Sequence, residues 1–397
     1  MSDPARYAVA ADHVFDGTSL HRDCAVVVDS GDVAQLVPRG DVPDGIPVHD
    51  VPAGAWLAPG FIDVQVNGGG DLLFNDDPTP ETIDAIAAAH RRFGTTGLLP
   101  TLISDTRAKM RAARDAVDTA MRSNPSVLGI HFEGPFLSAD RAGAHDPRML
   151  HRPDERDMEL LMPSGKGVTL VTLAPEIVPA GFIATLARAG TKASLGHSMA
   201  SYAQTRAALA EGLTGFTHLF NAMRPLASRE PGPVAAALEC ATCWFGMIVD
   251  GIHVDPTMLR LALRGKARPM LVTDAMPPVG GRRDTFMLGG HAVTAGHAAC
   301  TRADGTLAGT TLDMASAVRN SVRLLHMPLT DALRAAAAEP AAFLGLAHRL
   351  GRLAPGCRAD MVALDPSDIR VLETWIAGNA GPESARTNAG RNAGGRA

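Results

Sequence analysis

The sequence predicts an α/β fold, a (β/α)8 barrel with a small β-sandwich domain built from both chain ends. From Trp56 onward, short apolar runs alternate with Ala-rich segments of helical composition, and eight such runs can be counted up to Asp274. Residues 1–57 are β-rich instead, and a turn followed by a strand returns at residues 353–365. Alternating strands and helices are typical of a parallel barrel, and chain ends often meet. A doubly wound sheet is the alternative.

Length and composition are typical of a globular protein with one large and one smaller domain. The chain has 397 residues, of which 46% are hydrophobic and 20% charged. Its net charge of -5 does not suggest a nucleic-acid surface. No apolar run reaches the roughly 18 residues of a membrane helix, and the first residues lack a signal-peptide pattern. We therefore expect a soluble cytoplasmic protein that binds neither nucleic acid nor membranes.

The five cysteines do not indicate a disulfide framework. Cys240 and Cys243 form a C-x-x-C pair, but no second pair and no thioredoxin-like context accompanies it. We expect two packed thiols here rather than a zinc knuckle or a redox pair.

Turn residues and apolar runs divide the chain into its expected elements. Residues 8–10, 25–28 and 34–37 are short apolar runs separated by Asp, Gly and Pro, which predicts strands of the N-terminal β layer. The barrel strands are expected near residues 61–67, 97–102, 127–133, 168–174, 192–197, 215–218, 244–249 and 269–274. We assign residues 1–57 and 350–378 to the β-sandwich, 58–349 to the barrel, and 379–397, which are rich in Gly, Asn, Ala and Arg, to a disordered tail.

Helices are expected between these strands. Their ranges are residues 80–93, 106–123, 181–189, 201–211, 233–240 and 255–264. Ser201 and Asp255-Pro256 are typical helix-start signals. After Asp274, a Gly-rich stretch leads to residues 307–311, and a helical pattern then continues to Leu344.

Metal-binding and proton-transfer groups gather where the predicted strands end. Glu133 ends one strand, and a buried carboxylate there needs a cation, either a metal ion or an Arg or Lys partner. His197 and His218 end two later strands. Each alone is more often a core histidine, but two imidazoles and one carboxylate on one face of a barrel form the usual catalytic zinc shell. Asp274 ends the eighth strand, where it either caps the next loop or serves as a general base beside the metal.

A polar, Pro-rich loop at residues 221–232 directly follows the segment with His218. Arg229 in this loop is a fork-shaped donor that suits phosphate. A surface ion pair is the alternative, and the residues of the loop alone favour that alternative.

Six short motifs occur in one order and spacing along the chain. They read PGFIDVQVNG at residues 59–68, HFEGPF at 131–136, GHS at 196–198, THLFNAM at 217–223, DGIH at 250–253 and TDA at 273–275. Together they resemble the N-acetylglucosamine-6-phosphate deacetylase family of the amidohydrolase superfamily. The resemblance covers residues from about 55 to 365, and the N-terminal strands are similar too.

The resemblance implies a hydrolase that removes acetate from N-acetylglucosamine 6-phosphate, a sugar-phosphate substrate, and leaves glucosamine 6-phosphate. Carried over by motif, Glu133, His197 and His218 are the metal ligands, and Asp274 is the acid/base for a metal-bound water nucleophile. His145 is expected to meet the acetyl carbonyl. Further substrate contacts are expected from Ala144, Asn221, Ala222, Arg229, Asp250, His253, Leu307, Ala308, Gly309 and Thr310. The family is usually homodimeric, and Arg229 and His253 can reach the phosphate from a neighbouring subunit.

The chain departs from relatives of this family at three places. Many amidohydrolases end the first strand with His-x-His and hold two metals, whereas this chain has Gln65-Val66-Asn67. Neither polar side chain is a good transition-metal ligand, so we expect one divalent metal per subunit, with Zn²⁺ favoured and Fe²⁺, Mn²⁺ and Co²⁺ tolerated. No lysine ends the fourth strand, so no metal-bridging carbamylated lysine is expected. Ala144 has no hydroxyl, so its contact is expected through the backbone.

Three other functions stay open at this point. Deacetylation of N-acetylgalactosamine 6-phosphate differs only in the sugar epimer, which the residues do not distinguish. A cyclic-amide or N-acyl amino-acid hydrolase would not need Arg229 and His253. A non-catalytic barrel protein would be expected to have lost Asp274 or a metal ligand, and this chain retains them all.

Overall fold

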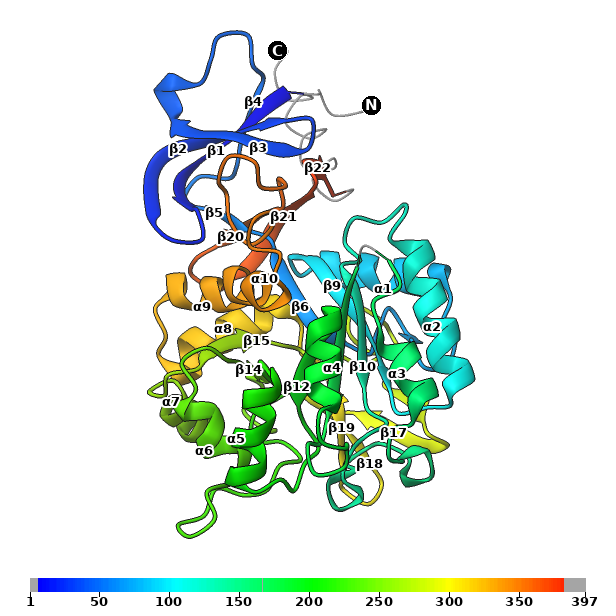
Figure 1. The fold of residues 1–397 in the computed structure, drawn as a ribbon. Coiled ribbons are helices and arrows are strands. Elements are labelled where there is room, and N and C mark those ends of the chain that lie inside the picture. The colour runs from blue at the N-terminus through cyan, green and yellow to red at the C-terminus, as the bar shows by residue number, and fades with distance from the viewer. Residues whose placement is uncertain (1–5, 166, 382–397) are drawn as a thin grey trace.

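The computed structural model describes residues 6–165 and 167–381, and it contains the predicted barrel (Figure 1). Eight parallel strands hydrogen-bond side by side in chain order. They are β6 (Phe61–Val66), β9 (Thr95–Ile103), β10 (Gly129–Glu133), β11 (Val168–Leu173), β12 (Lys192–Leu195), β13 (Gly215–Phe216), β14 (Trp244–Met247) and β15 (Arg268–Leu271). Each lies where an apolar run predicted a strand, because parallel strands are buried on both faces. The prediction of a (β/α)8 barrel is therefore confirmed.

The barrel closes between β6 and the segment that follows β15. The backbone N–H of Asp274 donates to the oxygen of Gln65 at 3.1 Å, and the N–H of Asn67 donates to the oxygen of Ala275 at 3.0 Å. Val66 and Ala275 form the matching parallel bridge. These bonds hold the carboxyl ends of the first and eighth strands together, so Gln65, Asn67 and Asp274 become neighbours.

Helices cover the outside of the barrel (Figure 1). They are α1 (Pro80–Arg91), α2 (Arg107–Ala120), α3 (Glu155–Leu161), α4 (Phe182–Ala189), α5 (Tyr202–Glu211), α6 (Gly232–Glu239), α7 (Pro256–Ala262), α8 (Met314–Leu325), α9 (Leu329–Ala336) and α10 (Ala338–Leu344). Ser201 caps α5 in a capping box with Gln204, and the Asp255 side chain accepts from the N–H of Thr257 at the start of α7. Both start signals are thus confirmed. The sequence interpretation missed α3, which a capping box at Asp154 begins.

Cys240 and Cys243 form a disulfide, so the expectation of two packed thiols is wrong. Cys240 is the extended residue that ends α6, and the chain turns there before β14. The turn brings the two Cα atoms within 5.6 Å, a separation that a disulfide spans. The other three cysteines are free and buried.

The small β domain is built from both chain ends, as predicted. Its strands are β1 (Arg6–Phe15), β2 (Leu20–Asp29), β3 (Asp32–Pro38), β4 (Val48–Asp50), β5 (Trp56–Pro59), β20 (Met361–Asp365), β21 (Arg370–Ile376) and β22 (Asn379–Ala380). They follow one hydrogen-bonded path, β22-β21-β20-β5-β1-β2-β3, with β4 paired to β1. The two chain ends join where β20 pairs with β5, with Val362 opposite Ala58. Val26, Leu57 and Trp375 share its buried core.

The start of the predicted disordered tail needs a correction, because its first residues form β22. Ala380 pairs with Trp375, and the Arg91 side chain donates to the backbone oxygen of Asn379 at 2.6 Å. These bonds order a segment whose composition alone favours disorder. Residues 382–397 of the predicted tail lie outside the described residues.

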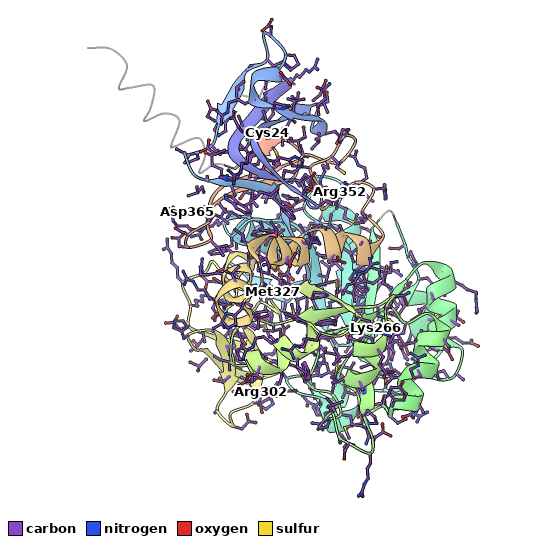
Figure 2. The ribbon with its side chains drawn as sticks, turned by 90° about the vertical axis from the view of Figure 1, so that its left-hand side faces the viewer. Cys24, Lys266, Arg302, Met327, Arg352 and Asp365 are labelled. Atoms are coloured by element: carbon purple, nitrogen blue, oxygen red, sulfur yellow. A yellow bond between two sulfur atoms is a disulfide. The ribbon has the colours of Figure 1, made fainter. Side chains whose placement is uncertain are left out.

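A four-stranded antiparallel sheet, which the sequence interpretation missed, follows the barrel strands. It consists of β16 (Thr285–Leu288), β17 (His291–Ala295), β18 (Ala299–Arg302) and β19 (Leu307–Thr310). Leu288, Val293 and Cys300 form its small core. Figure 2 shows Arg302 of β18 at the end of the molecule far from Cys24 of the β domain. These strands could not be recognised in the Gly-rich stretch, because they are short and partly exposed and therefore lack a long apolar run.

Shorter elements complete the fold. β7 (Gly68–Gly69) pairs with β8 (Leu72–Leu73), and the 3₁₀ helices are η1 (Arg39–Asp41), η2 (Ala139–Arg141) and η3 (Pro147–Met149). Among the helices of residues 6–165 and 167–381, none combines the length and apolar character that crossing a membrane requires.

Candidate active site

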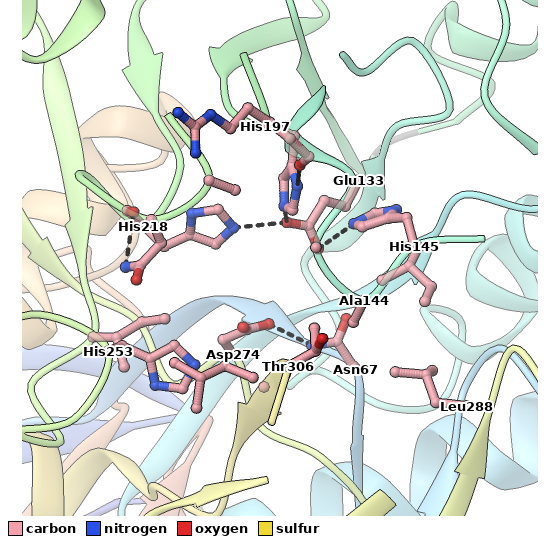
Figure 3. Close-up of a pocket in the computed structure, with 18 of the residues that line it drawn as sticks. Asn67, Glu133, Ala144, His145, His197, His218, His253, Asp274, Leu288 and Thr306 are labelled. Carbon is pink, nitrogen blue, oxygen red and sulfur yellow. Dashed lines mark hydrogen bonds and ion pairs between the residues drawn. The ribbon is translucent and has the colours of Figure 1, made fainter. Parts of the chain in front are cut away.

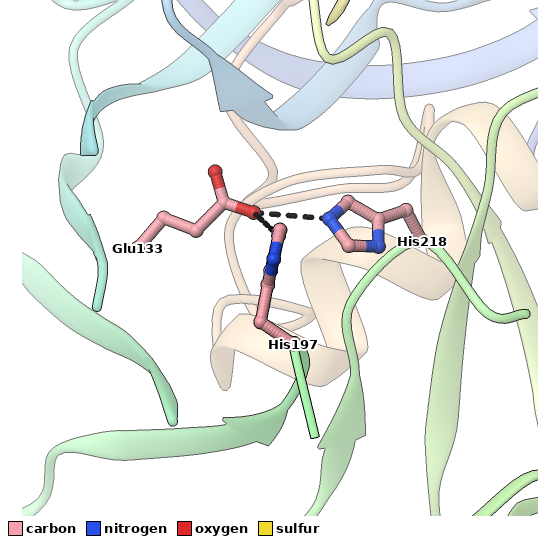
Figure 4. Close-up of side chains that lie close together, drawn as sticks. All are labelled: Glu133, His197 and His218. Atoms are coloured by element: carbon pink, nitrogen blue, oxygen red, sulfur yellow. Dashed lines mark hydrogen bonds and ion pairs between the residues drawn. The ribbon is translucent and has the colours of Figure 1, made fainter. Parts of the chain in front are cut away.

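Three side chains with ligand atoms for a metal meet at the carboxyl end of the barrel (Figure 4). Glu133 is the last residue of β10, and His197 and His218 follow β12 and β13. The Nε2 atoms of His197 and His218 lie 3.2 and 3.0 Å from Oε1 of Glu133. One ligand atom from each residue lies within 4.8 Å of the other two, and all three residues are buried. Two imidazole nitrogens and a carboxylate oxygen thus converge on one point.

The backbone turns sharply where the functional side chains leave the strands. His197, His218 and Asp274 have φ angles of 48°, 31° and 51°. This left-handed conformation costs an ordinary residue about 1–3 kcal/mol and concentrates at functional sites. Figure 3 shows the three side chains around one pocket. The strained turns therefore end the strands and support a functional assignment of this face.

Opposing influences set the charge of Glu133. Burial raises the pKa of its carboxyl, but hydrogen bonds from His197 and His218, together with their charges, bring the pKa well below its ordinary value. Burial by itself lowers the pKa of His218, but the hydrogen bond to Glu133 and the charges of Glu133 and Asp274 together outweigh burial and raise that pKa. Glu133 is consequently an anion in a buried site, which is stable only with cationic or hydrogen-bonding partners.

The residues of this cluster fit a divalent metal. Nδ1 of His197 lies 2.7 Å from the backbone oxygen of Arg141, which accepts a hydrogen bond from it. This bond holds a proton on Nδ1, so Nε2, which faces the cluster, is the nitrogen that a metal would bind in place of the hydrogen bond to Glu133. With His218 and Glu133, the donor set is the two-imidazole, one-carboxylate set of catalytic metal sites.

Asp274 lies beside the cluster and is held by two amides. Nδ2 of Asn67 donates to its Oδ1 at 2.6 Å, and Nε2 of Gln65 donates to the same atom at 3.2 Å. Gln65 also donates to Oε1 of Glu133 at 3.2 Å, so its amide bridges the two carboxylates. Burial and then the charge of Glu133 raise the pKa of Asp274 to about 6. A carboxylate with such a pKa can take up and release a proton near neutral pH.

His145 presents a neutral imidazole to the same space. The backbone N–H of Ser104 donates to its Nδ1 at 3.3 Å, and the Ser104 hydroxyl lies 2.7 Å from the same atom. Nδ1 therefore accepts, and the proton of the ring is on Nε2, which lies 4.0 Å from Oε2 of Glu133. Burial and then the charge of His197 lower the pKa of His145 to about 3. The ring can thus donate a hydrogen bond at neutral pH while carrying no charge.

A pocket of about 330 Å³ opens over the cluster of Glu133, His197 and His218 (Figure 3). Most residues expected from the sequence line it. They are Glu133, Ala144, His145, His197, His218, Asn221, Ala222, His253, Asp274, Leu307 and Gly309. The residues come from several strands and their following loops, which is the usual origin of an active site in this barrel.

Residues 56–387 match the amidohydrolase family. This chain belongs to the amidohydrolase family. Family membership implies a divalent metal, and Glu133, His197 and His218 form the group that could hold it. In this amidohydrolase both histidines contact Oε1 of Glu133.

Three proteins show what this amidohydrolase is similar to. It is 45% identical over 325 residues to N-acetylgalactosamine-6-phosphate deacetylase of Shewanella sp. (strain ANA-3), which covers 81% of this chain and 82% of that protein. It is 30% identical over 378 residues to N-acetylglucosamine-6-phosphate deacetylase of Haemophilus influenzae, covering 94% and 98%. The crystal structure of N-acetylglucosamine-6-phosphate deacetylase from Pasteurella multocida superimposes with a TM-score of 0.91 at 32% identity, covering 95% and 99%.

Four residues expected at the site of the amidohydrolase do not line the pocket. Arg229 is exposed on the loop before α6. Asp250 is buried behind His253, whose Nδ1 lies 2.6 Å from Oδ2 of Asp250, so it positions His253. Ala308 and Thr310 are fully buried in β19 on either side of Gly309. The sequence interpretation counted every residue of a motif as a contact, whereas successive residues of a strand point to opposite faces of the sheet.

Several lining residues of the amidohydrolase were missed by sequence reasoning. Arg141 and Asp140 of η2 line the pocket, and so do Leu288 and Thr306 of the four-stranded sheet region. Leu288 ends a strand that the sequence interpretation did not predict, so no signal pointed to it. For Arg141 a signal existed, because it lies between the motif with Glu133 and the expected His145.

Proposed function

We propose that this amidohydrolase hydrolyses the N-acetyl group of N-acetylglucosamine 6-phosphate to give glucosamine 6-phosphate and acetate. One observation carries the proposal. A metal-binding cluster, an amide-held carboxylate and a neutral imidazole donor face one pocket. An amide hydrolase needs these three functions: an electrophile, a proton acceptor that later becomes a donor, and a donor to the oxyanion. The named relatives support the choice of amino-sugar phosphate.

The reaction follows from the side chains around the pocket. When bound, a divalent metal polarises the acyl oxygen and lowers the pKa of water. Asp274 accepts a proton from water as the water oxygen bonds to the acyl carbon, and Nε2–H of His145 donates to the acyl oxygen. Asp274 then passes the proton to the amine nitrogen, which leaves as the C–N bond breaks. Asn67 and Gln65 hold Oδ1 of Asp274, so Oδ2 serves as the proton-carrying atom.

The proposed metal content is one divalent ion per subunit, with Zn²⁺ as the expected ion. Both amides at the end of β6 support a single ion, because Gln65 and Asn67 already donate to Asp274. A neutral side-chain amide would bind a metal through its oxygen, which is a poor ligand for a transition metal, so no second ion is proposed at these two residues. Zn²⁺ suits two imidazoles and one carboxylate with an open position, although Fe²⁺, Mn²⁺ and Co²⁺ also tolerate this set.

The substrate contacts and the assembly are part of the same proposal. Asn221, Ala222 and His253 are proposed to bind the sugar phosphate, together with Ala144 and the backbone of residues 307–310. We propose a cytoplasmic homodimer in which Arg229 reaches the phosphate of the neighbouring subunit. The exposure of Arg229 outside the pocket of its own chain supports this role in a second subunit.

A second candidate is the same reaction on N-acetylgalactosamine 6-phosphate. The observation that favours it is the 45% identity to a relative with that name, whereas the relative from Haemophilus influenzae is 30% identical. The two sugars differ at one hydroxyl, so the machinery at Glu133 and Asp274 serves both. Relative kcat/KM values for the two epimers decide between the candidates.

Acetate release tests the proposal. Purified protein is assayed with N-acetylglucosamine 6-phosphate, its galacto epimer, unphosphorylated N-acetylglucosamine and an N-acetyl amino acid, and metal is measured on the same sample. We expect release from a phosphorylated sugar, a much lower kcat/KM for the unphosphorylated sugar, and one metal per chain. Release from the acyl amino acid alone would overturn the sugar-phosphate assignment. Metal-replete protein with no hydrolysis of any amide would overturn catalysis itself.

A further inference from the structure

Arg141 differs from every other residue that lines the active-site pocket. Among the described residues around this pocket, it is the only Lys or Arg. It is the last residue of η2, in the loop between Glu133 and His145. Its position is well defined, because its backbone oxygen accepts from Nδ1 of His197 at 2.7 Å. A single guanidinium therefore lies in the pocket wall, on the residue that holds His197 of the candidate metal-binding cluster.

The guanidinium of Arg141 has no carboxylate partner. Its Nε lies 3.0 Å from the sulfur of Met199, and within residues 6–165 and 167–381 no Asp or Glu forms an ion pair with it. Arg148, seven residues later, instead pairs with Asp146 through Nη2 at 2.6 Å. A thioether is a weak acceptor and leaves the charge of Arg141 uncompensated. An unpaired, positioned guanidinium is suited to a planar or tetrahedral oxyanion.

Backbone pairing places this guanidinium beside the segment with Ala222. Met199 follows Ser198, whose backbone N–H donates to the backbone oxygen of Ala222 at 3.0 Å. The backbone N–H of Arg224 in turn donates to the backbone oxygen of Ser198 at 2.8 Å. Ala222 lines the pocket with φ of 48°. No acceptor for its backbone N–H is found in the described part of the chain. A free N–H in a left-handed turn beside an unpaired guanidinium is a combination that binds anions.

We propose that Arg141 binds the phosphate group of the substrate within its own chain and so contributes to substrate specificity. This inference rests on the proposed function, because it assumes a phosphorylated substrate. The residue then serves both ends of the ligand. Its backbone oxygen orients His197 at the amide end, and its side chain holds the phosphate beside the segment with Ala222. Remote binding of the phosphate keeps the amide against Asp274 and His145.

The test compares Arg141→Ala and Arg141→Lys with the wild type. The Ala variant is expected to lose about 10- to 150-fold in kcat/KM on the phosphorylated sugar, mainly through KM, as loss of a charge-assisted hydrogen bond predicts. The loss on unphosphorylated N-acetylglucosamine should be below about twofold, and the metal content should stay at the wild-type level. The Lys variant should recover part of the loss, because it keeps the charge without the fork.

Arg148→Ala is the matched control, since Arg148 lies on the same stretch, pairs with Asp146 and has a side chain 80% exposed. It should behave as wild type on both sugars. An equal loss of Arg141→Ala on both sugars, or a loss of metal, would show that the side chain only supports the loop and would overturn the inference. Undiminished kcat/KM on the phosphorylated sugar would overturn it too.

A binding experiment separates this inference from the proposed function. Titration of metal-replete protein with inorganic phosphate is followed by calorimetry, which needs no turnover. If the wild type releases no acetate but binds phosphate, and Arg141→Ala binds it at least about tenfold more weakly, the proposed function fails and the anion site stands. If Arg141→Ala binds phosphate as well as the wild type, or if neither binds it, the inference fails whatever the activity.

Discussion

The backbone oxygen of Arg141 accepts a 2.7 Å hydrogen bond from Nδ1 of His197, and the N–H of Ser138 donates to the backbone oxygen of His197 at 2.9 Å. Two hydrogen bonds thus clamp one candidate metal ligand to the loop that leads to His145. The loop contributes only backbone atoms to this clamp, so the tautomer of His197 does not depend on which side chain residue 141 carries. Changes to the Arg141 side chain can therefore separate anion binding from metal binding.

His197→Ala is expected to lose most of the bound metal. The remaining pair, Glu133 and His218, offers two ligands, which bind a divalent ion far more weakly than three. Elemental analysis after dialysis measures the metal, and His348→Ala, at an exposed histidine, is the control. Wild-type protein should hold close to one metal per chain. Two tightly held metals in the wild type, or full metal in the variant, would contradict the ligand assignment.

Asp274→Asn should retain metal and fold but lose about two to four decades of kcat. The asparagine is nearly isosteric, but it cannot carry the proton from water to the amine. Steady-state kinetics on metal-replete protein measures the loss, and circular dichroism checks the fold. Near-normal kcat in this variant would mean that another group transfers the proton.

Activity should fall as pH falls through the pKa of Asp274. Burial and the charge of Glu133 raise that pKa to about 6. The carboxylate is the form that accepts a proton, so kcat/KM is lost on the acid side and not on the alkaline side. A bound divalent cation favours the carboxylate and moves this limb below pH 6. A pH profile of kcat/KM measures it, and an acid limb well above pH 6 would argue against Asp274 as the base.

Ser104→Ala should lower kcat by about 2- to 10-fold and leave the metal content unchanged. The variant removes the hydroxyl 2.7 Å from Nδ1 of His145 and keeps the backbone N–H donor at 3.3 Å. Losing one of two donors is worth about 0.5–1.5 kcal/mol and weakens the preference for a proton on Nε2. Ser367→Ala, at an exposed serine, is the control. An unchanged kcat would show that the backbone donor alone sets the tautomer.

Arg229→Ala tests the proposed neighbouring subunit. We expect a loss of about 10- to 150-fold in kcat/KM on the phosphorylated sugar, the size of a charge-assisted pair, and little change on the unphosphorylated sugar. Raised salt should affect the wild type more than the variant, because salt screens the charge pair. Mixed dimers of Arg229→Ala and Asp274→Asn chains should recover part of the activity if Arg229 acts across the interface. The same loss on both sugars would assign Arg229 to its loop instead.

Strand positions and strand-end residues could be predicted because each depends on local sequence. An apolar run ends at Glu133 or Asp274 in the chain itself, and the barrel rule brings such ends to one face. The role of Gln65 could not be predicted, because its contacts to Glu133 and Asp274 arise only when β6 meets the segment after β15. The position of Leu288 in the pocket could not be predicted for a similar reason, since its strand is short and its burial depends on packing against other elements.

The pairing of β20 with β5 bears on where the protein can be attached to a support or fused to another protein. It gathers Arg6, where β1 begins, and Ala380, where β22 ends, in one sheet at the end of the molecule opposite β17, β18 and β19 (Figure 1). Leu307 and Gly309 of β19 line the pocket. Attachment near Arg6 or Ala380, to a solid support or to a fused protein, would leave the mouth of the pocket facing the bulk solution. Tethering close to Arg6 or Ala380 would therefore not obstruct the entry of a ligand.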